Sequence, residues 1–350
     1  MYVIRIFSPK SQRGMSLVEI MVGLVIGLIG MLVIFQTVSS WGRRTATTTS
    51  GGDAQTAGAI GMYHLERDIK QAGWGFGMAP LVNMGCLVSA TRTFRLAPVE
   101  IVQGASGAPD TVSVLYGNSG SFTAISTFIT PNPLVPLVIA SNLQPGFNVN
   151  DRAILANGAN CALVNVSVSA SLNMTIVYDL GVGGTPVAAG NIFNLGPAPV
   201  HAVWQIDGGK SLAWSDTVSN SAVAEIADGV IDMQAEYGVD GDTNNRITDG
   251  SGGTVNEWQT ADPTDWTKIR AVRIALLVRS KQFEKPASSA SEQSWSAPQP
   301  SWAGGNFVMN NVDGTADSNV AGSPNNWRNY RYEVFEKVIP LRNMIWGTGP

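Results

Sequence analysis

The chain has 350 residues, of which 44% are hydrophobic and only 14% charged, and its 22 Lys and Arg against 26 Asp and Glu give a net charge of −4. This much apolar surface excludes global disorder and allows a real core. The acidic balance, without any Lys/Arg cluster, disfavours a nucleic-acid partner, because binding to phosphate depends on basic patches. Two His and two Cys are too few for most His-based catalysis or for a zinc ribbon.

The N-terminal segment combines a short basic stretch with a long apolar one. Residues 1–14 contain three cations and no acid, whereas residues 15–35 carry a single charge, Glu19. The apolar stretch, extended over residues 15–41, is long enough to cross a bilayer core of ~30 Å. A small residue, Gly14, precedes this stretch, whereas an ordinary secretory signal is cut after its apolar part. Cleavage after Gly14 would therefore remove a leader peptide and keep the hydrophobic helix.

Glu19 is the informative residue of this segment. A carboxylate inside a membrane helix costs ~2.5–3.5 kcal/mol on insertion scales, so it usually has a partner and a role. If the chain is cut after Gly14, the new amino group of Met15 lies one helical turn from Glu19. The two groups could then pair, within one chain or between neighbouring chains. An uncleaved signal anchor, with Glu19 near the lipid headgroups, is the alternative, and the residues alone leave both open.

Two glycines in the apolar stretch, Gly23 and Gly27, have the GxxxG spacing that permits close approach of another helix. Glycines are also common in membrane helices without such a role. We favour a helix-packing role for this pair.

A second helical stretch follows the apolar one. Helical patterning pauses over residues 45–52, where Thr and paired Gly weaken a helix, and it resumes at Asp53, a plausible N-cap. Glycines after residue 72 are natural C-terminal stops. We therefore expect a helix over residues 15–75 with a break near Gly51. Its second half has an apolar face of Leu65, Ile69 and Ala72, and an outer face of Glu66, Arg67, Asp68 and Lys70.

From residue 77 onward the hydrophobic period changes from helical to alternating. The predicted strands are residues 111–116, 122–129, 153–156, 162–169, 174–178, 200–206, 230–239, 269–278 and 330–340. Antiparallel strands separated by Gly, Pro and Asn turns predict a β-rich globular domain over residues 76–350. Together with the N-terminal helix, this makes an α+β protein.

A polar segment over residues 285–329 interrupts this domain, and we expect it to be an exposed, flexible loop. It contains Trp295, Trp302 and Trp327. These rings would form either an exposed aromatic contact surface or small satellite cores, and the sequence does not decide between them.

The N-terminal motif resembles the class III leader of type IV prepilins, through Arg13-Gly14-Met15-Ser16-Leu17-Val18-Glu19 and the apolar run after it. Further stretches are similar to PilW-type minor pilins: residues 64–74, 237–240 and 338–343. Residues 90–227 carry no motif that matches this family.

This resemblance implies a fold, processing steps and a role. The fold would be a pilin-like one, with the long helix packed on the β-rich domain. A prepilin peptidase would cut between Gly14 and Met15 and N-methylate Met15, and Glu19 would neutralise a neighbouring subunit's amine. The protein would be an inner-membrane, single-pass subunit with a periplasmic domain, later part of the filament or its tip. Its partners would be major and other minor pilins, a tip adhesin and the inner-membrane assembly platform, and its role would be to prime pilus assembly.

Two rival functions stay open. A minor pseudopilin of a type II secretion system has the same leader and helix. A membrane-tethered periplasmic enzyme or calcium-dependent binding module would instead keep residues 1–14 on an uncleaved anchor.

Residues 240–249 are the best candidate for a metal site, because an Asp-x-Asp-x-Asn loop can wrap oxygens around Ca²⁺. The bidentate Glu that usually ends such a loop is missing, since Ser251 stands there, so Asp249 or Glu257 would have to replace it. An ordinary polar hairpin turn is the alternative. We expect weak calcium binding at most, and no other cofactor. The candidate ligands are Asp240, Asp242, Asn244, the carbonyl of Arg246, Thr248 and Asp249.

The two cysteines, Cys86 and Cys161, lie beyond the membrane helix, on the exported side if the leader interpretation holds. In an oxidising compartment two such thiols usually pair, here closing a loop of 161 − 86 = 75 residues. Two buried free thiols are the alternative, because sequence does not give the distance between them.

Catalysis has little support in the sequence. His64 lies on the polar side of a helix and His201 opens a strand, and neither adjoins a nucleophile motif. Asp228, Asp232 and Glu236 are spaced by four, so they would share a helix face or line the solvated edge of a strand. Any chain with 26 acids offers such pairs, and we do not expect an enzyme.

Overall fold

The computed structural model describes residues 14, 16–77, 84–89, 94–120, 126–129, 137–139, 147–158, 160–170, 173–178, 189–208, 210–242, 244, 246–250, 256–284, 296–315 and 325–346. The chain divides into two compact units, Met1–Ser50 and Gly51–Pro350, which are described separately below.

Helix α1 (Leu17–Gln71) begins in the first unit and ends in the second. The predicted break near Gly51 is wrong, because α1 is continuous through this position. The hydroxyls of Thr45 and Thr56 donate to carbonyls four residues earlier, at 3.1 and 2.9 Å, so these polar side chains are satisfied within the helix. The cost of ~1 kcal/mol for each interior glycine is small for a helix this long, because helix formation is cooperative.

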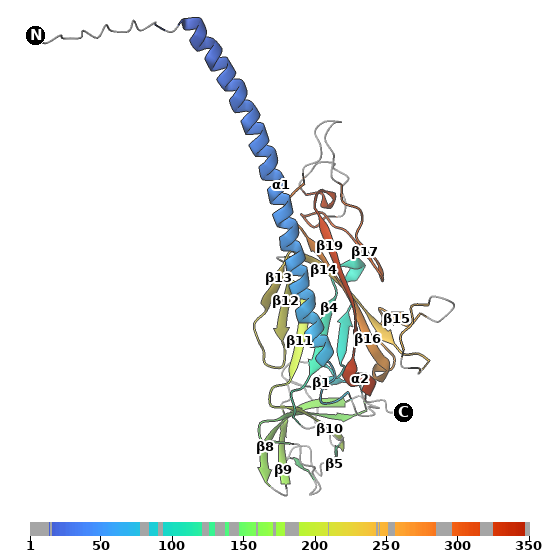
Figure 1. Ribbon diagram of the computed structural model, residues 1–350. Helices are drawn as coiled ribbons and strands as arrows, with labels where there is room; N and C mark the ends of the chain where they lie inside the picture. The colour runs from blue at the N-terminus through green and yellow to red at the C-terminus, as the bar shows by residue number, and fades with distance from the viewer. Residues whose placement is uncertain are drawn as a thin grey trace, which may run out of the picture. The chain divides into compact units, whose positions relative to one another are not determined.

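The strands of the second unit form three main sheets (Figure 1). Sheet A contains β1 (Leu87–Ser89), β2 (Phe94–Arg95), β5 (Ser126–Ile129), β6 (Leu137–Ile139), β7 (Arg152–Asn157), β8 (Asn160–Ala170), β9 (Asn173–Tyr178) and β10 (Ala189–Gly196). Sheet B has the order β13 (Ala224–Asp228), β12 (Ser211–Asp216), β11 (Val200–Ile206), β4 (Thr111–Tyr116), β3 (Val99–Val102). Sheet C has the order β15 (Trp258–Gln259), β14 (Val230–Val239), β16 (Ile269–Arg279), β19 (Tyr332–Pro340).

Short elements connect and cover these sheets. Among the described residues they include a hairpin of β17 (Ser301–Trp302) and β18 (Gly305–Asn306), the 3₁₀ turns Ala105–Gly107, Trp266–Lys268 and Trp327–Asn329, and helix α2 (Arg342–Trp346). Among the described strands every pairing is antiparallel except β1 with β8. The α+β class, with a long N-terminal helix and antiparallel sheets, is therefore confirmed.

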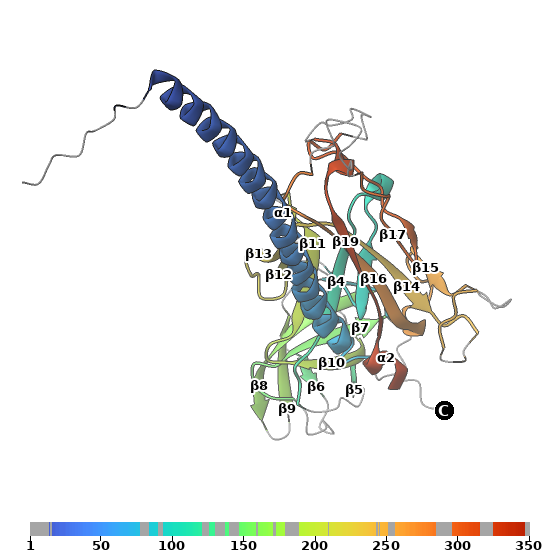
Figure 2. The ribbon, with the colours of Figure 1, turned by 45° about the horizontal axis from the view of Figure 1, so that its top comes forward.

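The main core lies between the C-terminal part of α1 and sheets B and C, which Figure 2 shows beside the helix. Two glycines on this face of the helix allow close contact. A Cβ on Gly58 would lie 2.1 Å from the ring of Phe335 on β19, and one on Gly61 would lie 3.0 Å from Leu212 on β12. Both sheets therefore approach the helix where it lacks side chains. As predicted, the helix stops before Gly73, whose φ of 80° suits a glycine.

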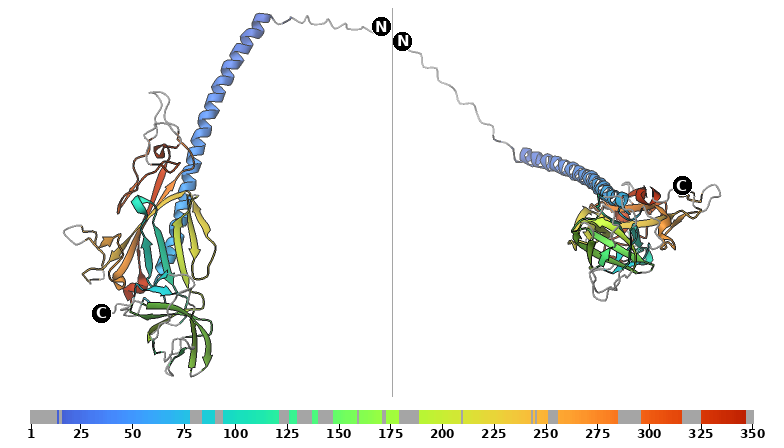
Figure 3. Two further views of the ribbon diagram at one scale, coloured as in Figure 1. Left: turned by 180° about the vertical axis from the view of Figure 1, so that it is seen from behind. Right: turned by 90° about the horizontal axis from the view of Figure 1, so that it is seen from below.

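Strands β7 to β10 of sheet A (green in Figure 3) lie at one end of this unit, and sheet A borders a second core, to which Phe76 and Leu115 also contribute. The predicted disulfide lies in this core and is confirmed: Cys86 and Cys161 are bonded, with their Cα atoms 5.9 Å apart. Both side chains are buried among Val88, Phe94 and other apolar residues. The bond joins the chain leaving α1 to the centre of sheet A, since Val88 on β1 is the register partner of Cys161 on β8.

The prediction of a flexible loop over residues 285–329 is wrong for its described part, because this segment packs on the outer face of sheet C. Phe307 is 1% exposed and sits against Ala275 and Leu277. Trp302 borders this cluster, and Trp327 is buried, so both belong to satellite cores rather than to an exposed aromatic surface. Trp295 lies outside the described residues.

Candidate assembly helix and carboxylate loop

The predicted assembly residues lie at the start of α1. Its first turn is set by Ser16, whose carbonyl accepts hydrogen bonds from the backbone N–H groups of Glu19 and Ile20 at 3.0 and 3.2 Å. Glu19 is exposed in this turn, where a carboxylate is favoured by the helix dipole. Gly14 is exposed too, and Met15 lies outside the described residues, so its cleavage and methylation stay predictions.

Glu19, Gly23 and Gly27 recur at intervals of four and therefore share one helix face. A Cβ built on either glycine would meet no described atom within 4 Å, so this face is open to a second helix. Among the described residues, α1 is the one helix long and apolar enough to cross a membrane, with a mean hydropathy of 2.7 over its most apolar window. The geometry thus combines a membrane-length helix, one carboxylate and a smooth packing face.

The other end of α1 is held by the C-terminal segment of the chain. The side-chain amide of Asn343, on α2, donates to the carbonyls of Gln71 and Ala72 at 3.1 and 3.0 Å. The carbonyl of Gln71 also accepts from the backbone N–H of Trp74 at 3.1 Å, so Asn343 adds a side-chain cap to the C-terminal turn of α1 from 272 residues away. Lys337 on β19 bonds Glu66 at 2.7 Å and, together with Lys70, lowers the pKa of that carboxyl. Sequence reasoning missed the Asn343 cap, although residues 338–343 resemble the family.

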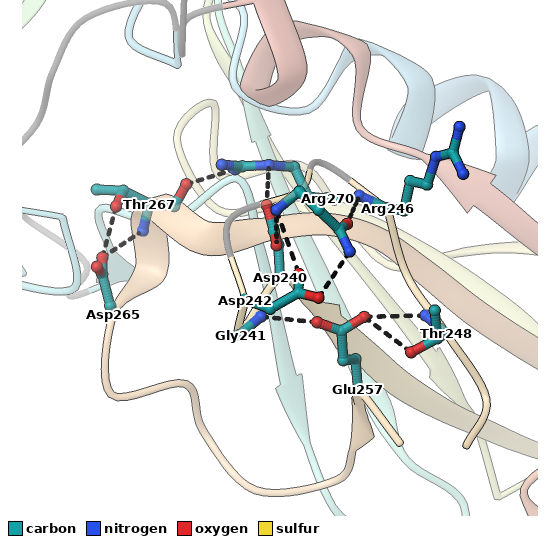
Figure 4. Close-up of polar contacts among 10 residues, drawn as sticks. Asp240, Gly241, Asp242, Arg246, Thr248, Glu257, Asp265, Thr267 and Arg270 are labelled. Carbon is teal, nitrogen blue, oxygen red and sulfur yellow. Dashed lines mark hydrogen bonds and ion pairs between the residues drawn. The ribbon is translucent and has the colours of Figure 1, made fainter. Parts of the chain in front are cut away.

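Three carboxylates converge at the end of sheet C, in the predicted metal loop (Figure 4). Carboxylate oxygens of Asp240, Asp242 and Glu257 all lie within 4.8 Å of one another. Asp240 and Glu257 are buried, whereas Asp242 is exposed. Glu257 accepts hydrogen bonds from the backbone N–H groups of Gly241 and Thr248, both at 2.9 Å, and so ties the two sides of the loop together.

The other predicted ligands stand around this cluster. Asn244 donates its backbone N–H to Asp240 and its amide to Asp242, and its side-chain oxygen accepts from the backbone of Arg246. The guanidinium of Arg246 points away from the carboxylates (Figure 4). Asp249 is not part of the cluster, and its backbone forms an isolated antiparallel β-bridge with Asn256. Of the two alternatives for the missing Glu, the structure therefore places Glu257, not Asp249, beside Asp240.

A neighbouring cation partly compensates the three charges, because the guanidinium of Arg270 lies 3.6 Å from Asp240 and also donates to the carbonyl of Thr267. Two negative charges in excess would favour a divalent cation, whereas Arg270 would weaken its binding. Weak calcium binding at this loop stays a prediction.

We expect Tb³⁺, used as a calcium probe, to bind this loop with an affinity in the millimolar range, reported by luminescence sensitised through Trp258. Asp242→Asn should weaken this binding about tenfold or more, since it removes one ligand charge from an exposed position and keeps a side-chain oxygen that can accept from the backbone N–H of Asn244. Asp313→Asn, which alters an exposed carboxylate in another loop, is the matched control. Equal binding to the chain and to Asp242→Asn would remove the loop as the site.

The two histidines, the next candidates for a titratable site, are held in packing contacts. His201 is buried, stacks on Phe94 with ring centroids 4.8 Å apart, and has its Nδ1 2.6 Å from the hydroxyl of Thr217. Burial lowers the pKa of His201 to about 4, so this ring is neutral at ordinary pH. His64 packs edge-on against Tyr63. Both histidines therefore fit packing roles.

The three spaced acids lie in strands rather than on a helix. Asp228 ends β13 and pairs with Lys281. Asp232 and Glu236 lie on β14 and both are buried, so the predicted solvated edge is wrong. Burial raises the pKa of Asp232 to about 6, and Glu236 pairs with Arg273.

Comparison with known proteins yields two family matches. Residues 209–343 match the family model described as Type IV Pilus-assembly protein W, and residues 9–35 match the prokaryotic N-terminal methylation motif. No curated protein matches the chain. Among solved structures it is similar to the type IV-like pilin TTHA1219 from Thermus thermophilus, with 10% identity over 83% of this chain and 96% of that chain and a TM-score of 0.32.

The chain therefore resembles type IV pilins at both ends. It carries a prepilin methylation motif at the start of α1 and a PilW-type pilus-assembly domain that includes β14, β16 and β19. The resemblance that the sequence motifs indicated is confirmed.

Proposed function

We propose that this protein is a minor pilin of a type IV pilus, a structural subunit that primes filament assembly. The carrying observation is that one chain joins the methylation motif and a membrane-length helix to a pilus-assembly domain. Before assembly, α1 anchors the chain in the inner membrane with the globular unit in the periplasm. In the filament, the face of Glu19, Gly23 and Gly27 packs against neighbouring helices. The role requires no catalytic turnover.

The leader, helix α1 and the globular unit each need a partner for this function. A prepilin peptidase processes the chain between Gly14 and Met15, and the assembly platform extracts the helix from the membrane. Other minor pilins and the major pilin contact the open face of α1. A position in the tip complex beside an adhesin would suit a subunit with a large globular unit.

We expect the chain recovered from membranes to begin at N-methylated Met15 only when the prepilin peptidase is present. N-terminal sequencing and mass spectrometry of the full-length product, from cells with and without the peptidase, measure this directly. Gly14→Val, made in peptidase-containing cells, should leave residues 1–14 attached and serves as the control. A chain that keeps these residues in all three samples, or is cut after the apolar run, would leave the tethered binding module or enzyme as the better reading.

A minor pseudopilin of a type II secretion system is the second candidate, and it would pass the same processing test. The family description of residues 209–343 refers to pilus assembly, which favours the pilus. Deleting the gene should reduce surface pili and leave release of secreted enzymes unchanged. The opposite pattern would assign the chain to secretion.

A further inference from the structure

The sequence places Asp68 on the outer face of α1 with Glu66, Arg67 and Lys70, and for Asp68 this is wrong. Its side chain is fully buried, with an exposure of 0%. The reason is its spacing: Asp68 follows Leu65 by three residues and precedes Ala72 by four, so it lies in the stripe that faces the sheets. A carboxylate therefore occupies the centre of an otherwise apolar helix–sheet contact.

Hydrogen-bond donors from adjacent strands of sheet B converge on this carboxylate. The indole N–H of Trp204, on β11, donates to its Oδ2 at 3.2 Å, and the hydroxyl of Tyr116, on β4, donates to its Oδ1 at 3.4 Å. Trp214, the register partner of Trp204 on β12, also lowers the pKa of Asp68. Arg67, about half exposed, supplies the nearest cation at 3.1 Å. Burial nevertheless raises the pKa of Asp68 overall.

This arrangement is a poor device for stability alone. A buried charge with a single, solvent-exposed partner loses most of its hydration, and apolar replacements of buried ion pairs are often neutral or stabilising. What the carboxylate adds is a set of hydrogen bonds, which depend on orientation. The rest of the stripe, Gly61, Leu65, Ile69 and Ala72, is aliphatic or small, so it constrains the helix through the fit of its surface, because hydrophobic burial itself has no preferred direction. The hydrogen bonds of Asp68 hold at one setting of the helix only.

We propose that Asp68 is a positioning residue whose acceptor oxygens fix the rotation and axial register of α1 on sheet B. A slip by one turn, about 5.4 Å, or a rotation by one residue, about 100°, would leave the carboxylate buried without its donors.

The register decides which residues of α1 stay outside. Ile60 and Tyr63 are 44% and 63% exposed, and together with Gln55, Thr56, Ala59 and His64 they line a shallow hollow of about 460 Å³ on the helix. Rotation of α1 by one residue would turn this apolar strip away from the surface that a neighbouring subunit can reach. The consequence for assembly rests on the proposed pilin function, whereas the register itself does not.

The test compares Asp68→Leu, Asp68→Asn and a matched control, Leu65→Ala, in the full-length chain in detergent. Hydrogen exchange over residues 58–72, relative to exchange in β16, reports the register, and incorporation into purified pili reports assembly. Asp68→Leu should speed exchange over residues 58–72 at least tenfold, with β16 unchanged, and lower incorporation at least tenfold. Asp68→Asn keeps an acceptor oxygen and should remain within about twofold of the native chain in both.

Leu65→Ala removes a buried side chain from the same stripe without touching a hydrogen bond, so it should speed exchange in both regions together, as a global loss of stability does. If Asp68→Leu does not fold, Trp204→Phe decides instead, since it removes one donor and keeps an aromatic ring. It should then speed exchange selectively over residues 58–72.

Native exchange over residues 58–72 in Asp68→Leu, or in Trp204→Phe where Asp68→Leu is unfolded, would overturn the proposal. So would an Asp68→Asn variant as defective as Asp68→Leu, or a Leu65→Ala variant with the same selective pattern. If the native chain itself never enters pili while the exchange results hold, the pilin function fails and the register role of Asp68 stands.

Discussion

Glu19→Ala should leave the protein in the membrane at nearly normal amounts and lower its incorporation into pili at least tenfold. The reason is that the substitution changes the free energy of the membrane-anchored state and that of the filament in opposite directions. In the membrane, alanine removes a carboxylate whose insertion is unfavourable, by up to ~2.5–3.5 kcal/mol at the bilayer centre and by less near the helix end, so anchoring is not weakened. In the filament, it removes the acceptor for a neighbouring amine. A hydrogen bond to a charged group contributes ~1.5–3 kcal/mol, and each 1.4 kcal/mol is a factor of about ten.

The open face of α1 makes this prediction specific to pairing between chains. Glu19 shares its face with Gly23 and Gly27, where no described atom would meet an added Cβ within 4 Å. A helix from a neighbouring subunit can therefore approach closely, in a setting where water no longer screens the charges. Membrane fractions and sheared pili, quantified by immunoblot from the same cells, measure the two states.

Glu19→Gln is the matched variant, because it keeps the shape and hydrogen-bonding oxygen and removes only the charge. It should fall close to Glu19→Ala if the partner is a protonated amine, whereas Glu19→Asp should recover part of the incorporation. Normal incorporation of Glu19→Gln would contradict amine pairing and leave Glu19 as a headgroup-level residue of an ordinary anchor.

The sequence predicts several strands well, because β-branched and apolar residues run through them between turn residues. The predicted strands over residues 111–116, 200–206 and 230–239 have the observed bounds. The pattern misses β12, whose burial does not alternate, and β13, an edge strand with an exposed Glu225. It also misses β1 and β2, which are too short to have a period.

The candidate sites show which information a sequence lacks. Asp240 and Asp242 are predicted from local spacing, but the choice of Glu257 over Asp249 depends on the hairpin that brings residues 256–257 back beside residue 241. Asp68 looks exposed because it sits among charged neighbours, although its spacing from Leu65 already carries the opposite signal. Local sequence patterns predict which helices and strands form and which residues are candidate ligands. The turns that reverse the chain decide which side chains then lie close together.

Removing the disulfide should destabilise the globular unit by about 4 kcal/mol, because the bond closes a 75-residue loop and the chain-entropy term grows with loop length. Cys86→Ala combined with Cys161→Ala is the preferred variant, since alanine adds no unsatisfied hydroxyl to this buried site. For a domain of this size, the loss corresponds to a fall in Tm of roughly 10 °C. Thermal unfolding of the full-length chain in detergent, followed by circular dichroism, measures it.

Reductant supplies the matched control for this prediction. The native chain, unfolded and refolded in reductant, should have the Tm of the double variant, and the double variant should not respond to reductant. The location of the bond makes the effect global. It ties β1, which directly follows the chain leaving α1, to β8, and its sulfurs lie in a core shared with Phe76 and Leu115. An unchanged Tm with faster hydrogen exchange in sheet A alone would mean that sheet A unfolds independently, so that the disulfide stabilises this sheet and not the surface on which α1 packs.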